Sequence, residues 1–127
     1  MDVFKRKAFK RWQANEGLSD LLLCNAALEI ENGLIDAHLG GLLFKKRIAR
    51  EYGGKRDGHR TILSARIGDR CIFLLGFSKN ERANITSDET KALRHIGRVI
   101  LDMTPSELQL AVAAGVLMEV DCEQHTH

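Results

Sequence analysis

The apolar residues of the N-terminal third recur with the spacing of a helix. Between residues 20 and 32 they fall at steps of three and four positions, which puts their side chains on one helix face. This stripe consists of Leu22, Leu23, Ala26, Ala27 and Ile30. Ser19 is a suitable N-cap and Gly33 a suitable stop, so the pattern predicts a helix over residues 20–32. Residues 3–12 predict a short strand that runs into an earlier helix, which Gly17 ends.

The middle of the chain has the pattern of strands. Residues 43–48, 60–66 and 71–77 are short apolar or alternating segments. Residues 51–58 are rich in glycine and predict a loop, and Gly68 with Asp69 predicts a tight turn. The third segment is apolar at every position of both faces, which predicts a central and deeply buried strand.

Two capping boxes predict two further helices. Thr86 with Glu89, and Thr104 with Glu107, place a hydroxyl residue three positions before a glutamate. Pro105 suits the first position of the second helix. The resulting order, β-α-α-β-β-β-α-α, predicts one α+β domain with a small antiparallel sheet.

The composition favours a folded globule over a disordered chain. The sequence has 127 residues, of which 44% are hydrophobic, and it contains a single proline. No segment approaches the roughly 18 apolar residues of a membrane span, and no signal peptide is evident. Cys24, Cys71 and Cys122 are far apart and odd in number, so we expect reduced thiols in a cytoplasmic protein. No cysteine or histidine spacing indicates zinc.

The net charge of +2 conceals a strong partition. Residues 17–40 carry four acids and no base, and residues 101–127 carry five acids and no base. Residues 41–60 carry seven basic and two acidic residues. This distribution favours binding of a polyanion, although runs of charge are also common on solvated surfaces.

The basic segment predicts a cluster of cations on one sheet face. Lys45 and Arg47 alternate with apolar neighbours and therefore share a face. Arg60 begins the next strand and Lys79 follows the third, so pairing of these strands would bring the four residues together. Like charges at such spacing repel by about 1 kcal/mol each, and a phosphodiester would relieve the repulsion. The alternative is that Lys45 and Arg47 form the solvent side of an amphipathic strand.

The same segment carries a family resemblance. Residues 44–50 and 53–62 resemble the central segment of RelE/HigB-type toxins, in which a basic strand leads through a glycine-rich basic loop to a Gly-x-Arg. Residues 73–81 are similar to the family's last apolar strand, and residues 32–41 to its linker. The similarity covers most of residues 1–103, in order. Residues 104–127 would then form a helical extension and an acidic tail of the same domain.

The resemblance implies a fold, an activity and partners. The family fold is a twisted antiparallel sheet packed against two N-terminal helices, with C-terminal helices. Its toxins bind in the ribosomal decoding site and cut mRNA by attack of the ribose 2′-OH on the adjacent phosphate, without a metal or other cofactor. A toxin requires a cognate antitoxin, and we expect a helix-turn-helix protein encoded next to it.

Carried over by position, the resemblance makes Lys45, Arg47, Arg60 and Lys79 the expected catalytic residues. Arg47 and Arg60 suit phosphate binding, since arginine does not readily accept a proton. Lys45 is the candidate base because neighbouring like charges disfavour its ammonium form. Lys79 is a phosphate ligand or a proton donor.

A second set of residues is expected to contact RNA. It consists of Lys46, Arg50, Tyr52, Lys55, Arg56, His59 and Arg82. His59 is also an alternative acid or base, but adjacent strand residues face opposite ways, so His59 and Arg60 should not both line the site. Lys46 shares the face of the apolar residues and is expected to reach the sheet edge. Tyr52 either stacks on RNA or only decorates the loop, and Arg82 could replace Lys79.

Two other functions remain open. A ParE-like toxin would inhibit a topoisomerase and cleave nothing, although it would not need the dense cations of the central strands. A non-catalytic RNA-binding module would bind RNA in a salt-dependent way without cutting it.

Overall fold

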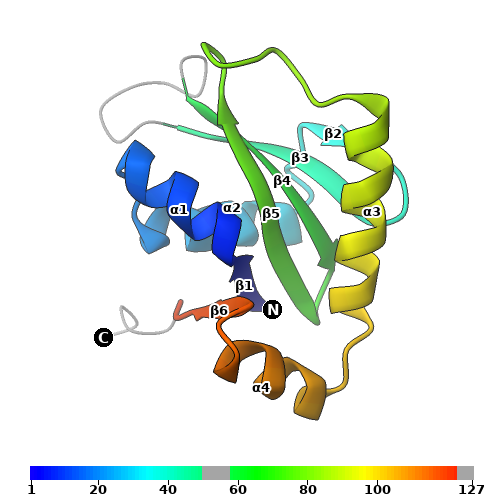
Figure 1. Cartoon of the computed structure of the whole chain (residues 1–127). Helices are drawn as coiled ribbons and strands as arrows, with labels where there is room; N and C mark the ends of the chain where they lie inside the picture. Colours follow the sequence, from blue (N-terminus) through cyan, green and yellow to red (C-terminus); the bar gives the residue numbers. More distant parts are fainter. Residues whose placement is uncertain (50–57, 123–127) are drawn as a thin grey trace.

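Six strands and four helices form the part of the chain that the computed structural model describes, residues 1–49 and 58–122 (Figure 1). The strands are β1 (Asp2–Arg6), β2 (Ala37–His38), β3 (Leu43–Ile48), β4 (His59–Arg66), β5 (Arg70–Ser78) and β6 (Leu117–Val120). The helices are α1 (Lys7–Glu16), α2 (Asp20–Glu31), α3 (Ser87–Leu101) and α4 (Pro105–Ala113). The predicted α+β class is confirmed, and each predicted helix and strand is present close to its expected bounds.

The described strands form one sheet in the order β2-β3-β4-β5-β1-β6. Neighbouring strands are antiparallel with one exception, the parallel pair of β1 and β5. The sheet is therefore mostly antiparallel, as predicted, but not entirely so. A parallel pair is possible here because two helices and three strands separate β1 from β5 and supply a long crossover.

Helices cover both faces of the sheet, with β5 between two cores. Alternate side chains of β5 enter different cores, because strand residues alternate between faces. Phe73 packs with residues of α1 and α2, whereas Ile72 and Leu74 pack with residues of α3 and α4. All three side chains are fully buried. Figure 1 shows α1 and α2 on one side of β5 and α3 on the other. The prediction that this strand is central and buried on both faces is confirmed.

Two glycines allow helices to approach the sheet closely. A Cβ atom at Gly97 of α3 would lie 1.8 Å from Ser64 Oγ of β4. A Cβ atom at Gly76 of β5 would lie 2.1 Å from Cε3 of Trp12 in α1. Neither contact fits a close-packed interior, so each glycine sets how near its helix lies to the strands.

Side-chain caps begin three helices where the sequence predicts them. Ser19 Oγ accepts a hydrogen bond from the Leu22 backbone N–H at the start of α2. Thr86 and Thr104 form complete capping boxes with Glu89 and Glu107, at the starts of α3 and α4. No helix in the described ranges is both long enough and apolar enough to cross a membrane.

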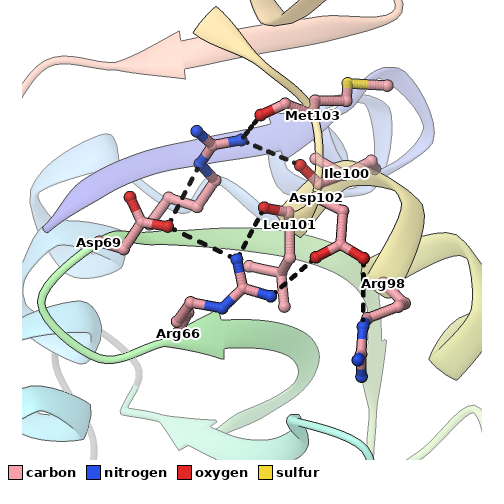
Figure 2. A network of polar contacts seen from close by, with 8 residues as sticks. Arg66, Asp69, Arg98, Ile100, Leu101, Asp102 and Met103 are labelled. Carbon is pink, nitrogen blue, oxygen red and sulfur yellow. Dashed lines mark hydrogen bonds and ion pairs between the residues drawn. The ribbon is translucent and has the colours of Figure 1, made fainter.

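Two arginines at the β4–β5 turn hold the C-terminal end of α3 (Figure 2). Arg66 donates to the Leu101 carbonyl at 3.0 Å and to Asp102 Oδ1 at 2.8 Å. Arg70 donates to the carbonyls of Ile100 and Met103 at 3.2 and 2.8 Å. The bonds to Ile100 and Leu101 satisfy carbonyls that a helix end leaves without intrahelical partners. The hydrogen bond from Arg66 also holds the pKa of Asp102 below its ordinary value.

The C-terminal segment adds a strand that is not predicted from the sequence. β6 pairs antiparallel with β1, with Val120 opposite Val3 and Leu117 opposite Arg6. Leu117 and Val120 are buried. Residues as far as Val120 are therefore built into the same sheet as the strands of residues 1–103. The short strand β2 is likewise not predicted.

The expectation of three reduced thiols is wrong for this structure. Cys24 of α2 and Cys122, which follows β6, form a disulfide across a sequence separation of 98. Their pairing depends on β6, which brings the end of the chain beside α2. Cys71 is free and fully buried, and burial raises the pKa of its thiol to about 12.

Candidate nucleic-acid interface

β3 and β4 bring three of the predicted catalytic cations onto one face of the sheet. Arg47 lies directly opposite Arg60 in the antiparallel register, and Lys45 lies opposite Ile62. Opposed residues of such a pair point to the same face, with Cβ atoms about 4.5–5.5 Å apart. The prediction that Lys45, Arg47 and Arg60 share a face is confirmed, whereas their catalytic role stays a prediction.

Exposure of this face increases along β3. Leu43 begins the strand and is fully buried in the core that includes α3, Lys45 is half-buried, and Arg47 is exposed. The Leu43 end of the face is therefore covered, and the Arg47 end is exposed. Arg60 itself is only 9% exposed, and its Nη1 donates to the Gly58 carbonyl at 3.5 Å.

No carboxylate of the described residues pairs with the side chain of Lys45 or Arg47. Within residues 1–49 and 58–122, neither side chain forms a hydrogen bond or an ion pair. The nearby carboxylate of Asp36 accepts instead from the backbone N–H of Arg47, at 2.6 Å. Because like charges opposite each other destabilise a sheet, an anion bound between Arg47 and Arg60 would stabilise this region.

A fourth cation adjoins this face from beyond the end of β5. Phe77 lies opposite Arg60 in the β4–β5 register, and the guanidinium of Arg82 lies 5.4 Å from the centre of its ring. Arg82 also donates from Nε to the Asn84 carbonyl at 3.1 Å, and its Nη2 pairs with Glu89. The side chain is 36% exposed. The structure thus places Arg82, which was expected to contact RNA, next to the Arg60 position.

The turn after β5 is tied together by its own polar groups. The backbone N–H groups of Glu81 and Arg82 both donate to the Ser78 carbonyl. The Glu81 carboxylate accepts from the Ser78 N–H at 3.1 Å, and this bond lowers the pKa of Glu81. Lys79 lies exposed in the turn, two residues beyond Phe77. Its expected catalytic role stays a prediction.

Lys46 and His59 lie on the opposite face of the sheet. Lys46 Nζ pairs with Glu29 Oε1 at 2.8 Å and donates to the Leu34 carbonyl at 2.9 Å. His59 Nε2 lies 3.1 Å from Glu16 Oε1. The prediction that His59 and Arg60 face opposite ways is confirmed. The prediction that Lys46 reaches the sheet edge is wrong, because the side chain of Lys46 is buried.

Lys46 and His59 therefore fasten the sheet to α1 and α2. Both residues are predicted from the sequence to contact RNA, yet they are only 3% and 6% exposed. Burial against carboxylates of two helices leaves neither of them available to a ligand on the Arg60 face. We exclude both from the proposed RNA surface. The burial of Lys46 could have been predicted from the sequence, because strand alternation places Lys46 on the same face as Phe44 and Ile48.

A third buried cation on the face of α1 and α2 is not predicted by the sequence analysis. Lys5 Nζ donates to Gln13 Oε1 and to Asp20 Oδ1, both at 2.9 Å. Gln13 Nε2 donates to Asp20 Oδ1 at 2.8 Å and to the Leu18 carbonyl at 3.0 Å. Burial alone would raise the pKa of Asp20, but the hydrogen bonds from Gln13 and Lys5 outweigh it and lower the pKa. This network joins β1 to the α1–α2 connection.

The remaining expected RNA contacts belong to the glycine-rich loop. Arg50, Tyr52, Lys55 and Arg56 lie outside the described residues. Among the residues that are described, no three His, Cys, Asp or Glu side chains are grouped as a metal site. What the described residues provide is a sheet face with cations in fixed register, of which Arg47 is exposed, Lys45 half-buried and Arg60 largely buried, an arrangement suited to binding a phosphate.

Comparison with known proteins identifies a family. The family model described as the RelE toxin of the RelE/RelB toxin–antitoxin system matches residues 1–120. The match includes β6 and α4, beyond the residues that carried the resemblance in the sequence. No curated protein matches the chain.

Proposed function

This chain belongs to the RelE toxin family of toxin–antitoxin systems, and from that premise we propose that it is a ribosome-dependent endoribonuclease that cuts mRNA to inhibit translation. The observation that carries the proposal is the direct opposition of Arg47 and Arg60 at the end of the sheet face that α3 leaves open, with Lys45 on the same face. Two permanently charged guanidinium groups at this spacing repel each other, so they favour an anion bound between them. A phosphodiester has oxygens that can accept hydrogen bonds from both.

The proposed reaction uses these side chains without a metal or other cofactor. Arg47 and Arg60 bind the phosphate and stabilise the added negative charge at the pentacoordinate phosphorus. Lys45, acting in its neutral amine form, accepts the proton of the ribose 2′-OH, whose oxygen attacks the phosphorus. The bond from phosphorus to the 5′-oxygen breaks, and Lys79 supplies the proton to that oxygen. The products are a 2′,3′-cyclic phosphate and a 5′-hydroxyl end.

Expression in cells that lack an antitoxin tests this function. We expect growth arrest, with new mRNA 5′ ends that appear only on translated messages. Removing one group that stabilises transition-state charge typically costs about 10²–10³ in rate, so Arg47→Ala and Arg60→Ala should each abolish arrest. Lys45→Ala should do the same.

Lys7→Ala is the matched control, because Lys7 is an exposed cation on α1, outside the proposed site. It should arrest growth as the wild type does. Unchanged arrest and cleavage in both Lys45→Ala and Arg60→Ala would refute the assigned site.

The same experiment separates the two alternatives. Arrest that is suppressed by excess topoisomerase, with mRNA left intact, would indicate a ParE-like toxin. Salt-dependent RNA binding by the purified protein, with no cleavage on translating ribosomes, would indicate a binding module.

Membership in the family implies a cognate antitoxin. We propose a helix-turn-helix antitoxin encoded by the neighbouring gene, which covers the cationic face or prevents the toxin from reaching the ribosome. The proposed substrate, mRNA on ribosomes, places the activity in the cytoplasm. Co-expression with the neighbouring gene should restore growth and yield a stable complex on purification.

A further inference from the structure

Glu89 takes part in two contacts at the N-terminal end of α3. Its Oε1 accepts from the Thr86 backbone N–H at 2.8 Å, which completes the capping box. The same oxygen pairs with Nη2 of Arg82. The hydrogen bond from Arg82, with that from Thr86, lowers the pKa of Glu89 to about 2. The carboxylate therefore stays charged throughout the physiological pH range.

The second capping box shows that helix capping does not require the arginine. At the start of α4, Glu107 Oε1 accepts from the Thr104 N–H at 2.8 Å, and the Glu107 N–H donates to Thr104 Oγ1 at 3.2 Å. These contacts match those at α3. Within the described part of the chain, however, no basic side chain pairs with Glu107. The contact between Glu89 and Arg82 therefore needs a reason other than capping.

The pairing fixes a guanidinium at the border of the cationic face. Arg82 is held on three sides, by Glu89, by the Asn84 carbonyl and by the ring of Phe77. Phe77 of β5 lies opposite Arg60 of β4. Because Arg82 lies over the Phe77 ring, it is held near the position of Arg60 in the sheet. Nε of Arg82 donates to Asn84 and Nη2 to Glu89, whereas a guanidinium has five N–H donors. Since the side chain is 36% exposed, donors remain for a ligand.

We propose that Glu89 is a positioning residue, which holds Arg82 over Phe77 so that the free donors of Arg82 bind the same RNA phosphate as Arg60 and Arg47. This inference rests on the proposed nuclease function. It makes the capping box of α3 part of the active site, and it distinguishes Glu89 from Glu107, whose box is otherwise alike.

The sign of the charge change separates positioning from simple electrostatics. Glu89→Gln keeps an acceptor for the Thr86 N–H, because glutamine also serves at this position of a capping box. The change removes a negative charge beside a cationic surface, so electrostatics alone would strengthen RNA binding and leave the chemical step intact. Loss of positioning predicts the opposite for the chemical step, because Arg82 no longer has a charged partner to hold it.

The test measures mRNA cleavage by the purified full-length protein on ribosomes programmed with one defined mRNA, over a range of ribosome concentrations. For Glu89→Gln we expect kcat to fall about tenfold to a hundredfold, the range for small displacements of a catalytic group, with KM unchanged or lower. Arg82→Lys, which keeps the charge but loses the planar fork, should show a similar loss in kcat. Thermal unfolding checks that each variant is folded.

Glu107→Gln is the matched control, since it makes the same substitution in the other capping box and changes the net charge equally. It should leave kcat and KM at wild-type values. The double variant with Glu89→Gln and Arg82→Ala should be no slower than Arg82→Ala alone, because Glu89 acts only through Arg82.

Three outcomes would overturn the proposal. They are a Glu89→Gln variant with wild-type kcat, equal losses in Glu89→Gln and Glu107→Gln, and additive losses in the double variant. Each of these leaves the nuclease function standing, provided that the wild type cleaves and Arg60→Ala does not. Absence of cleavage by the wild-type protein would instead refute the function itself.

Discussion

The disulfide between Cys24 and Cys122 leads to a large, measurable prediction about stability. It joins Cys24 of α2 to Cys122, the second residue after β6, across a sequence separation of 98. A cross-link of this span removes much of the conformational entropy of the unfolded chain. The chain-entropy relation for about 100 residues gives about 4.7 kcal/mol at 25 °C. That is a large part of the roughly 5–15 kcal/mol that keeps a typical domain folded.

The experiment reduces the disulfide in the purified protein and compares its stability with that of the double variant Cys24→Ser and Cys122→Ser. Urea unfolding is followed with and without a reducing agent. With a slope of about 2 kcal/mol per molar urea, the difference of about 4.7 kcal/mol corresponds to a shift in midpoint of roughly 2 M. The serine variant should unfold like the reduced wild type and should not respond to the reductant.

Cys71 provides the internal standard for counting thiols. It is fully buried and its thiol pKa is raised to about 12, so the folded protein should not expose it to a thiol reagent. In denaturant, the oxidised protein should release one reactive thiol and the reduced protein all three. Cys71→Ala should retain the full shift in midpoint. Three thiols in the denatured protein before any reduction, or equal midpoints with and without reductant, would refute the disulfide.

Three further predictions follow from contacts in the sheet and at its ends. Gly97→Ala should destabilise the fold by about 1–3 kcal/mol in urea unfolding, because its Cβ would meet Ser64 Oγ at 1.8 Å; unfolding as stable as the wild type would contradict this packing. Lys46→Met should leave mRNA cleavage unchanged, since Lys46 pairs with Glu29 in the interior, and a loss of cleavage in the folded variant would return Lys46 to the RNA surface. The hydrogen bond from Arg66 lowers the pKa of Asp102 from its ordinary value of 3.8. The charged Asp102 therefore stabilises the fold fully above pH 3.8, and this stabilisation is lost as the pH falls through the lowered pKa of the folded protein. Asp102→Asn should reduce the fall in Tm between pH 5 and the acid limit, and an identical acid profile would count against this pair.

Local elements of this protein could be predicted because their signals are local. The capping boxes of α3 and α4 need only residues three positions apart, and both are present as predicted. The alternation of β3 places Lys45 and Arg47 on one face whatever strand pairs with it. The shared face of Arg47 and Arg60 also depends on the β3–β4 register, which the structure supplies, because a slip of one residue would turn Arg60 to the other face.

The course of the C-terminal segment could not be predicted in the same way. β6 has four residues, and its place is fixed by β1 at the other end of the chain. The disulfide between Cys24 and Cys122 depends on that pairing and on the position of α2. No pattern within the segment carries this information, because the partner surfaces are more than 90 residues away in the sequence.

The sequence by itself determined which residues carry charge and which face of a strand they occupy. Only the tertiary structure decided what covers each face. Carboxylates from α1 and α2 pair with the buried Lys46 and His59 on one side, whereas Arg47 is exposed on the other. Arg82 reaches the site through Phe77 and Glu89, from two different elements. Strand alternation is a property of neighbouring residues, but the environment of a cation is set by elements that meet only on folding.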